Sequence, residues 1–150
     1  MTTVLNTVSY FFSVSGLIFI LTACCYQSES WQPWNECTDQ NIFITIGSCR
    51  ATQAFLCLSI IFIWIGMMTE KIVNTDKNEV RHYLWIGVCY FLGGVFMFIA
   101  MGIFTGSLNK YHHDSNVGIE WSSTWALGWA GASFEVFSGL LTISFYSLVD

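Results

Sequence analysis

Four long apolar stretches dominate the sequence and limit the folds that the chain can adopt. A helix needs roughly 20 mostly apolar residues to cross the hydrocarbon of a membrane, and such stretches lie near residues 8–26, 52–69, 84–105 and 124–148. Because lipid offers no hydrogen-bond partners, each stretch must satisfy its own backbone polar groups, which favours helices. The sequence therefore predicts an all-α transmembrane protein, with one four-span domain over residues 1–150 built as a four-helix bundle.

Charged residues are scarce, and their scarcity excludes several classes of function. They make up 10% of the chain, whereas globular domains carry about 25%. Five Lys and Arg against ten Asp and Glu give a net charge of −5, which leaves little to neutralise the phosphates of a nucleic acid. We therefore expect the lipid bilayer to surround most of the chain, and we expect no nucleic-acid partner.

The basic residues predict the orientation of the four spans. The middle loop, residues 70–83, holds three basic residues, and the other two loops together hold two. They are Lys71, Lys77 and Arg81 in the middle loop, and Arg50 and Lys110 in the other loops. Because positive side chains are enriched on the cytoplasmic side, we expect the middle loop and both termini in the cytoplasm, and the protein in the plasma membrane. Residues 1–7 carry no Lys or Arg, so the first stretch is expected to be a span rather than a cleaved signal.

Two of the six cysteines, Cys37 and Cys49, lie twelve positions apart in the polar first loop. We expect a disulfide between them, which would stabilise this loop by about 3 kcal/mol in the chain-entropy model and would place it on the oxidising side of the membrane. The alternative is a zinc site completed by His112 and His113, but the histidine and cysteine spacing does not support one, so we expect no metal. The remaining cysteines are expected to act as small packing residues: Cys24, Cys25, Cys57 and Cys89.

A β-branched run occupies residues 41–46, between the two loop cysteines, and ends at Gly47. Such a run is typical of a short strand. With residues 30–34 it could form a small extracellular β element stapled by the disulfide.

A Trp-x-x-Cys motif, Trp34 to Cys37, stands in the first loop, and Cys49 is followed at once by Arg50 and the second stretch. The fourth stretch adds a Gly-Trp-Ala run at 128–130 and small residues at 138–139. Together these motifs resemble the claudin, peripheral myelin protein and epithelial membrane protein superfamily. The resemblance implies a claudin-like fold, in which the tryptophan motif and the second cysteine staple an extracellular sheet over four helices.

The chain departs from claudins in ways that bear on its function. Gln32 and Pro33 precede Trp34 where a claudin has Gly-Leu, and the first loop is shorter than in claudins. Residues 148–150 also lack a PDZ-binding tail. We therefore expect a tetraspan accessory subunit that associates laterally with a larger membrane complex, such as a channel or receptor, or with copies of itself. The alternative is a cell-adhesion or cell-junction protein that contacts the opposing membrane.

Glu135 lies near the middle of the fourth stretch, where a charged group costs about 2.5 to 3.5 kcal/mol on insertion scales. Gly131 and Gly139 lie four residues to either side on the same helical face, where small residues let another helix approach. We expect Glu135 to be an uncharged acid that bonds to a Ser, Tyr or backbone group on a neighbouring helix. One alternative is contact with another protein, as in claudin-like accessory subunits of neurotransmitter-gated channels, which carry an acidic residue in the fourth helix. Ion or proton transport is disfavoured because no Asp, Lys, Arg or His joins Glu135.

Two further patterns suggest helix or partner contacts. Gly102 and Gly106 have the small-x-x-x-small spacing, for which we favour packing inside the bundle over dimerisation. Trp121, Trp125 and Trp129 step by four residues along the fourth stretch. We expect them to anchor the helix at the membrane interface, with a partner-binding face as the alternative.

Catalytic residues are not recognisable in the sequence. Serines in the apolar stretches have no adjacent His and Asp, and no paired carboxylates share a helical face. We therefore expect a non-enzymatic protein that needs no cofactor and acts by association.

Overall fold

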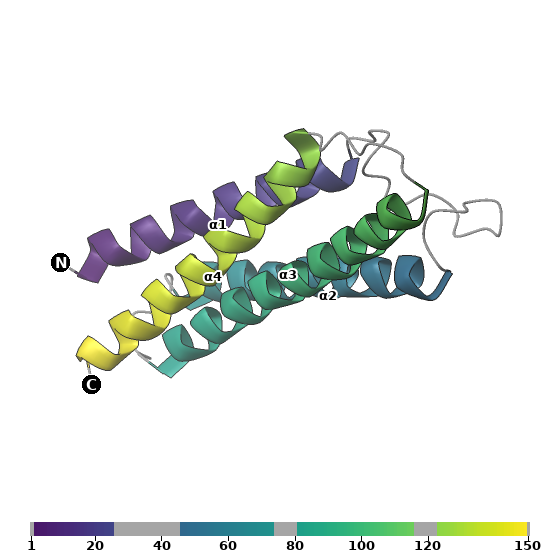
Figure 1. Cartoon of the computed structure of the whole chain (residues 1–150). Helices are drawn as coiled ribbons and strands as arrows, with labels where there is room; N and C mark the ends of the chain where they lie inside the picture. The colour runs from purple at the N-terminus through teal and green to yellow at the C-terminus, as the bar shows by residue number, and fades with distance from the viewer. Residues whose placement is uncertain (1, 26–45, 74–80, 116–122, 150) are drawn as a thin grey trace.

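The computed structural model consists of four long helices (Figure 1). It describes residues 2–25, 46–73, 81–115 and 123–149. The helices are α1 (Thr2–Cys25), α2 (Ile46–Val73), α3 (Arg81–Ser115) and α4 (Ser123–Val149). Each contains a segment that is long and apolar enough to cross a membrane: Thr7–Cys24, Gly47–Val73, His82–Ser107 and Trp125–Phe145. The prediction of an all-helical four-span bundle is confirmed.

All four helices are longer than hydropathy predicts, and α2 and α3 differ most from the predicted spans. The second span was expected over 52–69, but α2 begins at Ile46 and ends at Val73. The third was expected over 84–105, but α3 continues to Ser115. Because no proline lies in either segment, a helix can extend past the hydrocarbon into the polar boundary. Hydropathy marks the apolar part of a helix and not its ends.

The strand expected over 41–46 is wrong at its last residue, because Ile46 begins α2. The helix continues without a break through Ser48, whose carbonyl oxygen accepts a hydrogen bond from the Thr52 hydroxyl at 2.9 Å. Residues 30–34 and 41–45 lie outside the described residues, within which all the secondary structure is helical. The β element of the first loop therefore stays a prediction.

The helices form a row of neighbours rather than a fully closed ring. α3 packs along α2 and α4, α4 also packs along α1, and α1 and α2 touch only slightly. Figure 1 shows both termini at one end of the bundle, which we call the terminal end. α2 ends and α3 begins at this end, and the opposite end is called the loop end. The first and last helices are thus direct neighbours.

Buried positions recur at alternating intervals of three and four residues. In α2 they are Thr52, Leu56, Ser59, Ile63, Gly66, Glu70 and Val73. This spacing is typical of helices that pack side by side in a bundle. It puts one face of α2 into the core and leaves large apolar side chains such as Trp64 and Ile72 facing outward, where lipid can cover them.

The core differs between the two ends of the bundle. Toward the loop end it is apolar, with Leu17, Ile20, Cys24, Leu56, Ile63, Met97, Ala100, Met101, Phe104 and Ala132. Toward the terminal end the buried side chains include Ser9, Ser13, Glu70, Glu135, Ser138 and Thr142, beside a small apolar cluster of Val73, Ile86 and Tyr90. Most buried polar groups are therefore gathered in the terminal half.

Candidate functional site

Glu135 on α4 is fully buried and faces α1. Its Oε2 atom accepts a hydrogen bond from the Ser13 hydroxyl at 3.1 Å. Its Oε1 atom lies against Gly16, where an added Cβ would come within 2.8 Å of this oxygen. The carboxyl group fits between the two helices because Gly16 has no side chain. The hydrogen-bond partner of Glu135 is thus a serine on a neighbouring helix of the same chain.

The two glycines that flank Glu135 face different helices. A Cβ at Gly131 would lie 3.0 Å from the carbonyl oxygen of Gly16 on α1, whereas a Cβ at Gly139 would lie 2.5 Å from the backbone nitrogen of Phe91 on α3. Eight residues of helix rotate a position by about 80°, which is enough to reach a second neighbour. Glu135 and Gly131 thus lie in the contact of α4 with α1, whereas Gly139 lies in the contact of α4 with α3.

Hydroxyl groups extend the α1–α4 contact toward the terminal end. The Ser9 hydroxyl donates to the Ser138 carbonyl oxygen at 3.0 Å, and the Ser138 hydroxyl donates to the Ser9 carbonyl oxygen at 2.8 Å. The hydroxyl of Thr142 lies 2.5 Å from that of Ser9. Such bonds join the two helices directly and face no competition from water in the bilayer.

Replacing Ser138 with alanine tests the contribution of this reciprocal pair. We expect the free energy of unfolding to fall by about 1 kcal/mol, because Ser9 loses a hydroxyl partner and its carbonyl loses a donor. The matched control is Ser133→Ala, since Ser133 is exposed on α4 and bonds to the Trp129 carbonyl oxygen of its own helix. Unfolding of the purified protein in mild detergent measures both, and equal losses would contradict the role of Ser138.

A second buried glutamate, Glu70, lies near the terminal end of α2 and is 2% exposed. The fully buried Tyr90 on α3 donates its hydroxyl to Glu70 Oε2 at 2.5 Å. The Tyr90 ring fills the space beside Gly66, where an added Cβ would come within 2.7 Å of the ring. Sequence reasoning missed Glu70 because the second span was expected to end at residue 69. Its spacing of four residues from Gly66 and seven from Ile63 was a usable signal.

The two hydrogen-bonded pairs, Ser13 with Glu135 and Tyr90 with Glu70, lie next to each other. The Ser13 hydroxyl that bonds to Glu135 also lies close to the Tyr90 hydroxyl. Each helix thereby contributes one group, and we call Ser13, Glu70, Tyr90 and Glu135 the polar line. Among the described residues, the Oε1 atoms of Glu70 and Glu135 have no hydrogen-bond partner. That same part of the chain holds no group of three or more His, Cys, Asp or Glu side chains suited to a metal ion.

Gly102 and Gly106 lie on the outer side of α3. Both are exposed, and a Cβ added at either would meet no other part of the described chain within 4 Å. The expected internal packing is therefore wrong for this pair. The inner side of α3 uses Gly94 instead, where a Cβ would lie 2.7 Å from the backbone nitrogen of Val136. Gly102 is rotated from Gly94 by about 80° and Gly106 by about 120°, which turns both away from α4.

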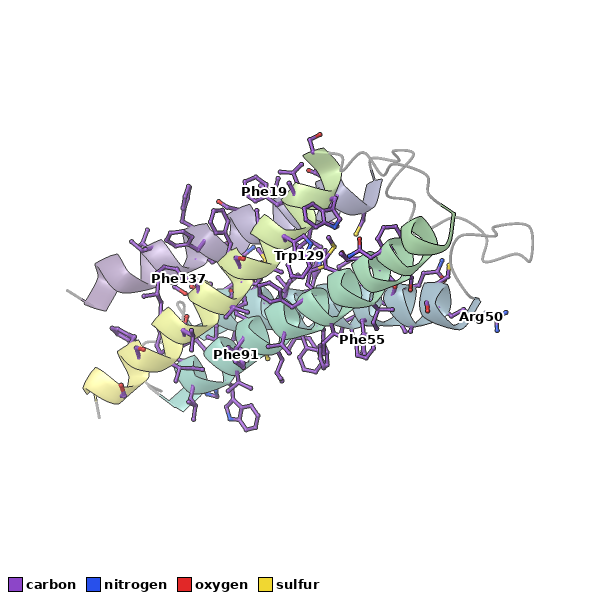
Figure 2. All side chains as sticks on the ribbon, in the orientation of Figure 1. Phe19, Arg50, Phe55, Phe91, Trp129 and Phe137 are labelled. Atoms are coloured by element: carbon purple, nitrogen blue, oxygen red, sulfur yellow. The ribbon has the colours of Figure 1, made fainter. Side chains whose placement is uncertain are left out.

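Trp125 and Trp129 pack against α3. The indole N–H of Trp125 donates to the Thr105 hydroxyl at 3.0 Å, and the Trp129 ring lies 5.4 Å from the Phe98 ring. Figure 2 shows Trp129 where α4 meets α3. Both side chains are half-buried, so they join helices as well as lying near the loop end. Trp121 lies outside the described residues.

The outer-loop motif is described only in part. Cys49 and Arg50 belong to the first turns of α2, and Figure 2 shows the exposed Arg50 side chain at the loop end, pointing away from the bundle. Trp34 and Cys37 lie outside the described residues, so the disulfide between Cys37 and Cys49 stays a prediction. Three other described cysteines keep their thiol groups: Cys24 in the core, Cys89 half-buried and Cys57 exposed.

The four apolar helices and their small and polar contact residues define an integral membrane protein with four spans. A family model described as PMP-22/EMP/MP20/Claudin tight junction matches residues 24–144. Because the match covers well over half of the chain, the chain belongs to this family, whose members are typically non-enzymatic membrane proteins. A comparison with curated proteins found no match.

Proposed function

We propose that this chain is an accessory subunit that associates laterally, within the membrane, with a larger complex such as a channel or receptor. The family establishes a tetraspan membrane protein, and the lateral role is an inference from the surface of the helices. The role is non-enzymatic, with both termini in the cytoplasm and the complex in the plasma membrane, as the basic residues of the middle loop favour.

The outer face of α3 carries this proposal. Gly102 and Gly106 are one turn apart and meet no other part of the described chain, and the exposed Ile99 lies on the same face one turn earlier. Small residues let a second helix come close in a membrane, where van der Waals packing drives helix association. The inward-facing glycines such as Gly94 and Gly139 are already filled by this chain's own helices. The Gly102–Gly106 surface is therefore available to another protein.

Glu135, unlike Gly102 and Gly106, is not exposed to a partner. It is fully buried and bonded to Ser13, so any effect of Glu135 on a partner acts through the α1–α4 contact. The half-buried Trp125 and Trp129 of α4 contact α3 through a hydrogen bond and a ring contact, so they stabilise the position of α3 against α4.

Substituting leucine for both Gly102 and Gly106 tests the proposal. We expect the wild-type chain, purified from its native membranes in mild detergent, to carry a larger membrane protein in a fixed ratio. The double variant should bind it about tenfold more weakly, because bulky side chains keep a partner helix at a distance. Ala54→Leu is the matched control, since Ala54 is exposed on α2 and leucine there adds the same kind of side chain to a different face.

Two results would contradict this function. One is a double variant that retains its partner as well as Ala54→Leu does. The other is a wild-type chain that binds no larger membrane protein and instead accumulates at cell contacts when expressed alone, which would support the adhesion or junction role. Residues 26–45 and 116–122, which would meet an opposing membrane in that role, lie outside the described residues.

A further inference from the structure

The polar line runs from the middle of the membrane to its boundary at the terminal end. Glu135 is the central residue of the span Trp125–Phe145, ten residues from either end, or about 15 Å at 1.5 Å per residue. Glu70 is three residues from the end of the span Gly47–Val73, or about 4.5 Å. Ser13 and Tyr90 lie between the two carboxyl groups.

We propose that the polar line passes protons between Glu135 and the water at the terminal end, which makes Glu135 a proton-binding site loaded from one side of the membrane. Each carboxyl group has one oxygen bonded into the line and a second, buried oxygen without a hydrogen-bond partner among the described residues. A buried carboxylate with a single partner is costly, whereas a carboxylic acid is uncharged and can donate its O–H to the Ser13 oxygen, which is the hydrogen-bond partner of Glu135 among the described residues. The proton is therefore the ligand that fits Glu135.

The transfer balances without any other reactant. The Ser13 hydroxyl turns from Glu135 toward Tyr90, so that Glu135 can give its carboxyl proton to the Ser13 oxygen while Ser13 gives its own hydroxyl proton to the Tyr90 oxygen. Tyr90 in turn gives its hydroxyl proton to Glu70 Oε2. Each hydroxyl group ends with one proton, Glu135 becomes a carboxylate and Glu70 a carboxylic acid. Glu70 then releases the proton to water at the terminal end, and the reverse sequence reloads Glu135.

The surroundings make this connection one-sided. Toward the loop end, the next buried side chains on α1 and α4 are apolar, Leu17, Ile20 and Ala132, and they offer no group that can carry a proton. The buried hydroxyl groups of α2 in this direction are not bonded to the polar line, because Thr52 bonds to Ser48 of its own helix and Ser59 has no hydrogen-bond partner among the described residues. At the terminal end, α3 places Tyr83 near Glu70, and α2 and α3 carry the exposed Lys71 and His82. α1 and α4 add the hydroxyl groups of Ser9, Ser138 and Thr142.

Infrared spectroscopy of the purified full-length protein in phosphatidylcholine nanodiscs tests the proposal. The signal is the carbonyl stretch of a protonated carboxylic acid, and Glu135→Gln assigns it to Glu135 by removing it. After transfer to D₂O, we expect this band to shift as deuterium replaces the proton. Tyr90→Phe should slow the shift by about 100-fold, because phenylalanine keeps the ring and removes the hydroxyl that lies between Ser13 and Glu70.

Tyr10→Phe is the matched control, because Tyr10 lies on α1 and is 41% exposed outside the line. Its exchange rate should equal that of the wild type. Backbone amide exchange, recorded in the same spectra, should be the same in all variants, since a purely structural effect of Tyr90→Phe would change it. If Tyr90→Phe does not fold, Ser13→Ala and Glu70→Gln break the line at its other two links and must slow exchange as well.

The proposal is overturned if Glu135→Gln removes no protonated-acid band, or if folded Tyr90→Phe exchanges at the wild-type rate. The measurement uses the protein without a partner, so its outcome is independent of the accessory-subunit role.

Discussion

Replacing Tyr90 with alanine is expected to lower the free energy of unfolding by about 3 to 5 kcal/mol. The Tyr90 side chain is fully buried between α2 and α3, where it fills the space beside Gly66 and packs with Val73 and Ile86. Alanine leaves a cavity in place of the ring and also leaves Glu70 without its hydrogen-bond donor. Reversible unfolding of the purified protein in mild detergent, followed by circular dichroism, measures the loss.

Two further variants separate packing from hydrogen bonding. Tyr90→Phe keeps the ring and removes the hydroxyl, so the expected loss is only about 0.5 to 2 kcal/mol. Trp85→Ala removes a larger ring from the same helix, but Trp85 is 62% exposed on the outer surface and the change should stay within about 0.5 kcal/mol. Similar losses for Tyr90→Ala and Trp85→Ala would show that the core is not where the structure puts it.

Adding one methyl group at Gly139 is expected to destabilise the bundle by about 2 to 3 kcal/mol. An alanine Cβ there would lie 2.5 Å from the backbone nitrogen of Phe91 and 2.8 Å from the carbonyl oxygen of Gly87. Backbone atoms cannot rotate away as a flexible side chain can, so α3 and α4 must move apart along their contact. The same unfolding measurement in detergent reports the effect.

Gly102→Ala is the matched control for this prediction. It also adds one methyl group to a glycine inside a membrane helix, but its Cβ meets no other part of the described chain. Alanine favours a helix over glycine by about 1 kcal/mol, so stability should stay the same or rise slightly. A loss at Gly102 as large as that at Gly139 would mean that the outer face of α3 is not open.

The number and type of elements could be predicted from the sequence, whereas their ends could not. Lipid leaves few solutions for a long apolar stretch, so four such stretches predicted four membrane helices, and the Trp-x-x-Cys motif added the family. The first helical turn of α3, at Arg81, and its last turns, up to Ser115, lie beyond the hydrocarbon. They carry polar residues, and a hydropathy scale therefore scores these turns as loop. The β-branched residue Ile46 illustrates the same limit, because local strand propensity yields to the helix that follows it.

The sequence predicted the part of the candidate site that depends on one unusual residue, the glutamate in mid-membrane. It did not predict the contacts that depend on how the helices are rotated against one another. Glu135 was identified because a carboxyl group in mid-membrane needs a protein partner, but spacing alone did not assign that partner to Ser13. Glu70 was missed because it lies at a span boundary, where acidic residues are common. Gly102 and Gly106 share the spacing of contact glycines, and only the rotation of α3 shows that they face outward.

The order of packing has a consequence for biosynthesis. α1 makes its main contacts with α4 and touches α2 only slightly, yet residues 26–122 separate the two helices in the chain. A ribosome adding about 5 to 20 residues per second finishes α1 many seconds before α4 begins. During that interval the serines and glycine on one side of α1 face the translocon or the lipid without their native neighbour. The nascent chain must therefore hold a partly polar helix in the membrane until the last helix arrives to cover it.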